Sequence, residues 1–324
     1  MLRTTFTELT GCTVPIQLVP MPLIATVELA AAVADAGGVG MIGTPMLPPP
    51  LVQQMLDDLR QRTRGVFGAG FLMPFLDREC LELAAANARL VEFFYGEPDA
   101  VLVEVVHRAG GLAGWQIGSK EEAQRAVDAG CDYIAAQGTE AGGHVRGNVG
   151  LLPLLSQVLE VVDVPVLAAG GIATARDVAA VLVAGAAGAR IGTRFVASTE
   201  SGAHPDYVRR LLAAGAGDTV LTEEFSADWP NAPHRVLRAS VEASEKFQGD
   251  TTGEVCIAGM KLPVSHRSAM CPSKETTGAI EAMALYAGES VASVTRVQPA
   301  AEIVRELSEG AEKLLQSPEF AGKG

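Results

Sequence analysis

The sequence predicts an α/β fold, a (β/α)8 TIM barrel with a small α+β cap inserted after the eighth strand. Short apolar runs recur eight times in the first two-thirds of the 324-residue chain, and helix-like segments separate them. Their spacing of about 20–30 residues is typical of βα units. A doubly wound open sheet is the alternative, but the count of eight and the glycines within the strands favour a barrel. The expected strands are 15–19, 38–44, 65–72, 90–96, 111–118, 133–138, 165–171 and 188–195.

Start and stop signals support the helices between these strands. Ser119 with Glu122, and Thr174 with Asp177, have capping-box spacing, in which a hydroxyl accepts from free N–H groups of the first turn. Several segments end in Ala-Gly, the expected C-cap. The clearest helical segments are 26–37, 121–130 and 175–188.

The regular alternation breaks after residue 196, where "FSADWPNAPHRV" and the charged stretch "VEASEKFQGDTTGE" follow. We interpret this part as the loop after strand eight, enlarged into a cap on the substrate side. The predicted division is 1–196 and 276–324 for the barrel and 197–275 for the cap. Two closing helices are expected at 276–290 and 300–316.

Composition limits the class of function. Hydrophobic residues make up 48% of the chain, enough for a full core, and aromatic residues only 5%, which suits helices packed closely on a buried parallel sheet. A net charge of −13 argues against nucleic acid or an anionic membrane as a partner. The polar start lacks a signal peptide's apolar core, no apolar run would span a bilayer, and five scattered cysteines suit reduced thiols. We expect a cytoplasmic enzyme with a small-molecule substrate and no metal; a homodimer is left open.

Two glycine turns mark a candidate phosphate site. Gly170-Gly171 ends strand seven and Gly192-Thr193 ends strand eight. In (β/α)8 barrels these two strand ends often hold a phosphate, because glycine lets backbone N–H groups approach its oxygens. Glycines that only make tight turns are the alternative, but two such pairs on adjacent strands favour phosphate binding.

The segment "AQGTEAGGHVRG" after strand six would lie on the same face of the barrel. Gln137 could exchange hydrogen bonds with a flat heterocycle, and Gly142 and Gly143 would let such a ring approach the backbone. His144 would then face the substrate. A histidine is more often structural than catalytic, but this glycine-rich strand end favours a functional one. No Ser or Cys nucleophile is paired with it, so acyl transfer is unsupported.

The other histidines have weaker claims to a role. His107 lies in helical sequence, and His204 and His234 flank prolines and are expected to make loop hydrogen bonds. His266 could face the site from the cap. Cys131 lies at the wrong end of strand six and is expected in the core.

These segments together resemble the nitronate monooxygenase family, formerly called 2-nitropropane dioxygenases. The resemblance runs almost end to end, and it implies a (β/α)8 barrel with a small extra domain that binds FMN non-covalently. The same superfamily includes FMN-dependent enoyl-ACP reductases and NAD(P)H:quinone reductases, so fold and flavin transfer more safely than substrate. The segments that carry it are "VELAAAVADAGGVGMIGT", "FGAGFLMPF", "AQGTEAGGH", "AAGGIATARDVAAVLVAGAAGARIGTRF" and "IEAMALYAGES".

The resemblance implies that His144 is the active-site histidine and that Gln137 and Gly142 contact the flavin. It places the phosphate against Gly171 and the run 190–193, and the isoalloxazine ring against backbone near Pro20 and Met21. The resulting cofactor-binding set is Pro20, Met21, Gly70, Gln137, Gly142, Gly143, Gly170, Gly171, Arg190, Ile191, Gly192, Thr193, Gly288 and Glu289.

Three positions depart from the family pattern. Gly70 replaces the usual Asn of strand three, "LVPM" replaces "QGPM" at strand one, and Glu289 replaces a neutral amide. Glu289 would disfavour negative charge on the flavin by repulsion. These departures leave the substrate open rather than the cofactor.

The expected reaction is oxidation of a nitronate with FMN and O2 to a carbonyl compound and nitrite. His144 would hold the nitronate by a hydrogen bond, or act as base on the neutral nitroalkane, and an imidazole pKa near neutrality suits either role. The alternative is an NAD(P)H-dependent FMN reductase of an enone, quinone or enoyl thioester, in which His144 would donate a proton. A flavin-storage or sensing role would not need the imidazole.

Overall fold

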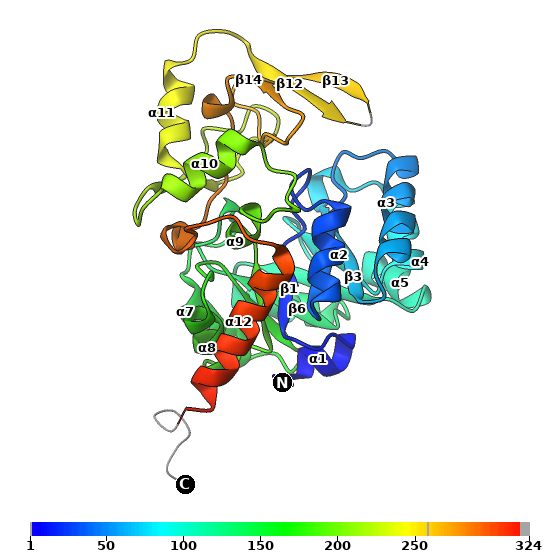
Figure 1. Cartoon of the computed structure of the whole chain (residues 1–324). Helices are drawn as coiled ribbons and strands as arrows, with labels where there is room; N and C mark the ends of the chain where they lie inside the picture. Colours follow the sequence, from blue (N-terminus) through cyan, green and yellow to red (C-terminus); the bar gives the residue numbers. More distant parts are fainter. Residues whose placement is uncertain (1, 258, 318–324) are drawn as a thin grey trace.

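The computed structural model describes residues 2–257 and 259–317. Eight parallel strands close into a barrel in the order β1-β2-β3-β4-β5-β6-β8-β9, because β1 pairs with both β2 and β9 (Figure 1). The predicted fold class is confirmed, and the open-sheet alternative is wrong. All eight predicted strands are present. Their bounds are β1 Ile16–Leu18, β2 Val39–Gly43, β3 Val66–Leu72, β4 Leu90–Phe94, β5 Leu112–Ile117, β6 Tyr133–Gln137, β8 Val166–Ala169 and β9 Gly188–Ile191.

Helices surround the barrel and bury their apolar faces against it. The helix N-cap residues act as predicted. The Ser119 hydroxyl accepts from Glu122 N, and Thr174 with Asp177 forms a complete capping box. Gly130 and Gly185 follow two C-caps with φ of 94° and 100°, the left-handed region that glycine adopts without strain. The barrel helices are α1 Thr5–Thr10, α2 Val27–Asp35, α3 Pro49–Arg62, α4 Arg78–Asn87, α5 Ala100–Arg108, α6 Lys120–Asp128, α7 Leu151–Leu159, α8 Ala175–Val183 and α12 Ala300–Leu315.

The barrel interior is polar near its centre. Gly114 of β5 allows this, because a Cβ there would lie 2.1 Å from the ring of Tyr133, which occupies the interior. The Tyr133 hydroxyl donates to Glu92, and Gln17 donates to that hydroxyl. Buried polar groups of this kind persist when they satisfy one another.

The residues after the short helix α9 (Thr193–Val196) form a cap above the carboxyl ends of the strands (Figure 1). One three-stranded sheet has the order β10-β11-β7, in which β7 belongs to the loop after barrel strand β6; the other has the order β13-β12-β14. The elements are α10 Pro205–Ala213, α11 Arg238–Lys246, β7 Gly143–His144, β10 Thr219–Thr222, β11 His234–Leu237, β12 Thr251–Ile257, β13 Met260–Ser265 and β14 Thr277–Gly278.

The helix predicted at 276–290 is wrong, whereas the one predicted at 300–316 is confirmed as α12, which packs beside α8 and α2. The first segment contains β14 and the 3-10 turns η2 (Ile280–Ala282) and η3 (Glu289–Ser293). The four residues from Ala282 to Leu285 are all buried, whereas a surface helix would expose some of them. The cap core surrounds this segment on several sides, so an irregular extended path buries more apolar surface than a helix would.

In the ranges 2–257 and 259–317, no helix is long and apolar enough to cross a membrane.

Candidate active site

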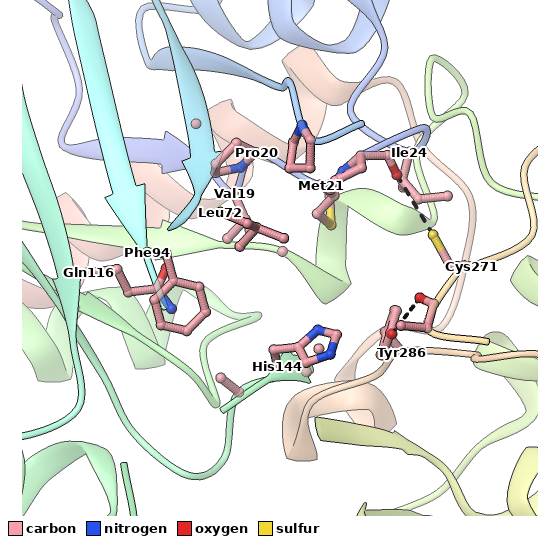
Figure 2. Close-up of a pocket in the computed structure, with 18 of the residues that line it drawn as sticks. Val19, Pro20, Met21, Ile24, Leu72, Phe94, Gln116, His144, Cys271 and Tyr286 are labelled. Carbon is pink, nitrogen blue, oxygen red and sulfur yellow. Dashed lines mark hydrogen bonds between the residues drawn. The ribbon is translucent and has the colours of Figure 1, made fainter. Parts of the chain in front are cut away.

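A cavity lies between the carboxyl ends of the barrel strands and the cap (Figure 2). Of the predicted cofactor-binding set, Ile191 and Glu289 do not belong to its lining. Ile191 packs into the barrel core, and the Glu289 side chain is 51% exposed and lies 3.0 Å from Arg235. The structure brings the remaining predicted residues together around the cavity: Pro20, Met21, Gly70, Gln137, Gly142, Gly143, His144, Gly170, Gly171, Arg190, Gly192, Thr193 and Gly288.

His144 faces the cavity from the side opposite Pro20 and Met21 (Figure 2). Strand β7 places it there, because Gly143 and His144 pair with Arg235 and His234 of the cap strand β11. The Gln137 amide donates to the His144 carbonyl at 2.9 Å and ties the loop back to β6. Both the barrel and the cap therefore fix the position of the imidazole.

Aromatic side chains enclose His144. The indole of Trp229 stacks on the imidazole, with ring centroids 4.0 Å apart, and Tyr286 and Tyr95 lie at 5.6 and 5.9 Å. His234, expected in a loop, lies fully buried in β11 with its ring at 5.2 Å. Its nitrogens are engaged by Ala232 O and Phe225 N, so it holds the cap together.

The imidazole of His144 is neutral. Burial, and secondarily the neighbouring His234, lower the pKa of His144 to about 3, so the expectation of a near-neutral pKa is wrong. A neutral imidazole has one N–H donor and one acceptor nitrogen. Within the part of the chain that the structure describes, its Nε2 atom is buried and has no hydrogen-bond partner. The imidazole lines the cavity and has hydrogen-bonding capacity that no described residue uses.

The two glycine turns meet at another part of the cavity. Gly170 and Gly171 have φ of 109° and 70°, so their backbone follows a path that other residues rarely adopt. The hydroxyl of Thr193 accepts from Gly288 N at 2.9 Å and can still donate its own hydrogen. This end of the cavity is therefore built mainly from backbone and one hydroxyl.

The structure explains why two further positions, 142 and 70, are glycine. A Cβ on Gly142 would lie 2.5 Å from Gly288 N, so Gly142 lets two loops touch. A Cβ on Gly70 would lie 2.3 Å from the Pro20 ring, so Pro20 fills the space that a side chain at position 70 would use. The departure at Gly70 thus replaces a polar side chain by an apolar ring at that edge of the cavity.

The floor of the cavity holds an ion pair that the sequence analysis missed. Arg190 of β9 pairs with Glu92 of β4 across the barrel, and the two side chains are 4% and 1% exposed. Among the described residues, Arg190 Nε has no partner. A single acidic residue inside the apolar run "LVEFFYG" was the signal that could have identified Glu92.

The cap side of the cavity was also missed. Apart from Asp228 it consists of apolar and aromatic side chains, and one of only two tryptophans in the chain lies there, a cue available from composition. Burial raises the pKa of the Cys271 thiol to about 12, so this thiol is unreactive. His266 bonds to Ser244 and does not line the cavity. The cap contributes Trp229, Ile257, Met270, Cys271 and Tyr286, and the barrel segments after β2 and β3 add Met46, Leu47 and Phe75.

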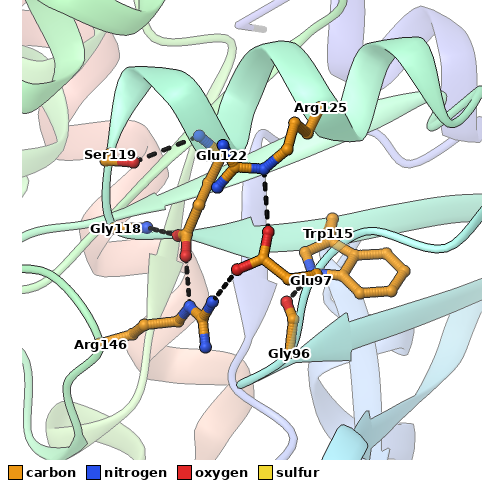
Figure 3. Close-up of polar contacts among 8 residues, drawn as sticks. All are labelled: Gly96, Glu97, Trp115, Gly118, Ser119, Glu122, Arg125 and Arg146. Carbon is orange, nitrogen blue, oxygen red and sulfur yellow. Dashed lines mark hydrogen bonds and ion pairs between the residues drawn. The ribbon is translucent and has the colours of Figure 1, made fainter.

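A charged network anchors the loop that follows His144 (Figure 3). Arg146 pairs with Glu122 and, at 2.6 Å, with Glu97, which also binds Arg125 at 2.9 Å. Glu122 in turn accepts from Gly118 N at 2.8 Å. The network joins the His144 loop to the start of α6 and to the loop after β4, so it limits the movement of the imidazole.

This protein is an oxidoreductase, as are the proteins that it resembles in sequence and structure. The chain belongs to the nitronate monooxygenase family, whose sequence pattern it matches over residues 74–310. This confirms the resemblance seen in the sequence.

Individual relatives differ in their reactions. The chain is 32% identical over 258 residues to the (3aS,4S,5R,7aS)-5-hydroxy-7a-methyl-1-oxo-octahydro-1H-indene-4-carboxyl-CoA dehydrogenase of Rhodococcus jostii, covering 79% of this chain and 72% of that protein. It is 27% identical to a probable nitronate monooxygenase of Bacillus subtilis, covering 86% and 90%. FabK of Thermotoga maritima superposes with a TM-score of 0.81, at 26% identity and 98% of both chains. Nitroalkane oxidase of Streptomyces ansochromogenes gives 0.78, at 29% identity over 96% and 100%.

Proposed function

We propose that this protein is an FMN-dependent nitronate monooxygenase that oxidises alkyl nitronates with O2 to a carbonyl compound and nitrite. The observation that carries the proposal is the buried His144, whose side chain lines the cavity and whose Nε2 has no hydrogen-bond partner among the described residues; burial lowers its pKa to about 3. A neutral imidazole can donate a hydrogen bond to an anionic nitronate oxygen. With a pKa of about 3 it is a weak base, so we infer that the substrate is the preformed nitronate.

The residues that line the cavity fit FMN. Gly170, Gly171 and Gly192 offer backbone to a phosphate, and the Thr193 hydroxyl can donate to it. The buried Gln137 Oε1 has no partner in the described ranges, so it can accept the imide N–H of a flavin ring. When bound, FMN would supply the electron acceptor. Pro20 and Met21 would then line the ring on the side opposite His144.

The protein's own side chains would bind the substrate and keep water out of the site. His144 would hold the nitronate oxygen, and the stacked Trp229 would keep the imidazole oriented and its surroundings dry. A dry site strengthens the hydrogen bond to a charged ligand. The apolar cap side would receive the alkyl part of the substrate.

A second candidate is an NAD(P)H-dependent FMN reductase of an enone, quinone or enoyl thioester, and similarity to a carboxyl-CoA dehydrogenase of Rhodococcus jostii supports a reaction other than nitronate oxidation. Against a coenzyme A thioester stands the lining of the cavity, whose charged members in the described part are Glu92, Arg190 and Asp228. Three phosphates would call for more than one arginine or lysine. A compact neutral enone or quinone fits this lining better.

The test is reconstitution of the purified protein with FMN, followed by two anaerobic runs. A preformed nitronate should bleach the visible flavin absorbance, and readmitted oxygen should restore the colour with release of nitrite. NADH and NADPH should leave the flavin oxidised. Bleaching by NADPH but not by a nitronate would favour the reductase, and failure to bind FMN would overturn both candidates.

A further inference from the structure

We propose that Arg190, charge-balanced by Glu92, is the residue that sets how readily the flavin ring takes on negative charge. This inference rests on the proposed FMN binding and assigns Arg190 to the ring rather than to the phosphate. It names a function for an ion pair in the floor of the cavity.

The pair is formed across the barrel. β4 and β9 lie four positions apart in the closed order of eight strands, so Glu92 and Arg190 come from opposite walls. Both side chains line the cavity and both are almost completely buried. The floor therefore holds one positive and one negative charge in a region of low effective dielectric, where charges act strongly on a nearby ligand.

Arg190 has an N–H donor that no described residue accepts. Its Nη2 donates to Glu92 Oε1, whereas its Nε–H is buried and unpartnered among the residues that the structure describes. A buried charged donor without an acceptor is unfavourable, so an acceptor from a ligand in the cavity is expected. The guanidinium has five N–H groups, and bonding to Glu92 leaves others free.

Both carboxylate oxygens of Glu92 accept hydrogen bonds within the floor of the cavity. Its Oε1 accepts from Arg190 and its Oε2 accepts from the Tyr133 hydroxyl at 3.3 Å. Removal of the Glu92 charge would leave the positive charge of Arg190 uncompensated, and removal of the Arg190 charge would leave Glu92 uncompensated. The two changes must therefore act on a neighbouring anionic ring in opposite directions.

The phosphate is a poor partner for Arg190. A phosphate dianion at this place would also lie near the Glu92 carboxylate, which repels it. Thr193 and the glycine turns offer a place that no carboxylate lines, because the nearby Glu140 lies outside the cavity lining and accepts from Leu151 N instead. A flavin ring carries delocalised negative charge only after it accepts electrons or a nucleophile, so it suits a charge-balanced floor better.

Sulfite tests this directly, because it adds to the ring of an oxidised flavin, leaves negative charge there and removes the visible absorbance. We would titrate FMN-loaded protein with sulfite and compare dissociation constants. Arg190→Gln should weaken sulfite binding roughly tenfold or more, and Glu92→Gln should strengthen it by a similar factor. Arg190→Lys should lie between Arg190→Gln and the wild type.

Arg194→Gln is the matched control. Arg194 is also a buried arginine, four residues along the chain, but it pairs with Gln298 and Glu306 and does not line the cavity. Its replacement should leave sulfite affinity within about twofold of the wild type, because its charge lies outside the floor.

The direction of the two shifts distinguishes an electrostatic role of the Arg190–Glu92 pair from a purely structural one. If Arg190→Gln and Glu92→Gln shift sulfite affinity in the same direction, or leave it unchanged, the pair is only structural and the inference is overturned. If Arg190→Gln does not fold, Glu92→Gln decides by itself. If the wild type does not bind FMN, the proposed function has failed instead.

Discussion

The two sides of the cavity are built in different ways. On the barrel side, the part that would hold the phosphate consists of glycine turns and one hydroxyl, contributed by segments close to strand ends, such as Gly171 and Thr193. The cap side consists of large side chains, such as Trp229 and Tyr286, that meet His144 from distant parts of the chain. Backbone recognises a group that every member of a family shares, whereas side chains can change with the substrate. We therefore expect barrel-side changes to affect the cofactor and cap-side changes to affect the substrate.

The largest expected effect is on the barrel side. Gly171→Asp should reduce FMN affinity at least 100-fold, because a carboxylate beside a phosphate costs several kcal/mol at low effective dielectric (about 4 kcal/mol at 4 Å). The space for a Cβ exists, since its nearest contact would be Glu140 Cβ at 3.4 Å. The measurement is a titration of apoprotein with FMN.

Gly171→Asn is the control for that experiment. Asn has the same size and tolerates the positive φ equally well, but it carries no charge. It should retain most of the affinity. Equal affinities for the two variants would place the phosphate elsewhere.

His144→Ala tests the boundary between the two sides. Loss of a hydrogen bond to a charged oxygen costs about 1.5–3 kcal/mol, so oxidation of a nitronate should slow by about 10- to 100-fold. FMN affinity should stay close to that of the wild type. Stopped-flow bleaching of the bound flavin measures the step, and an unchanged rate would make His144 structural.

Trp229→Ala tests the cap side. It removes the ring that stacks on His144, and we expect KM for a nitronate with a bulky alkyl group to rise about tenfold, an effect of about 1.4 kcal/mol. Trp229→Phe should recover most of the loss because an aromatic face remains. Weaker FMN binding by Trp229→Ala, with KM unchanged, would contradict the division between the two sides.

A further expected effect, similar in size, concerns stability. His144 has a folded-state pKa of about 3 against about 6.5 unfolded, so the unfolded state binds the extra proton between these values. The neutral His144 therefore costs no folding free energy above pH 6.5. As the pH falls from 6.5 toward 3, the folded state loses stability relative to the unfolded state. Between pH 7.5 and 5.5 the unfolding free energy of the apoprotein should fall by about 1.4 kcal/mol more than that of His144→Gln. Urea unfolding at the two pH values measures it, and parallel losses in both proteins would contradict the assignment.

The sequence by itself determined the barrel. Strands and their helices are encoded by local periodicity, and caps such as Thr174 and turns such as Gly170-Gly171 are encoded within a few residues. All eight strands, and the place of His144 in the loop that follows β6, could be predicted for this reason. The glycine turns could be placed on one face because parallel strands of a closed barrel end at the same edge.

Only the tertiary structure decided the rest, because it depends on contacts between residues distant in sequence. Glu92 and Arg190 meet across the barrel, and Trp229 reaches His144 through the pairing of β7 with β11. The low pKa of His144 follows from burial that these contacts create. The segment 276–290 has helix-forming residues, yet the cap core buries it on several sides and keeps it extended. Local patterns specify elements, whereas burial, charge pairing and the choice of neighbours exist only after the chain has folded.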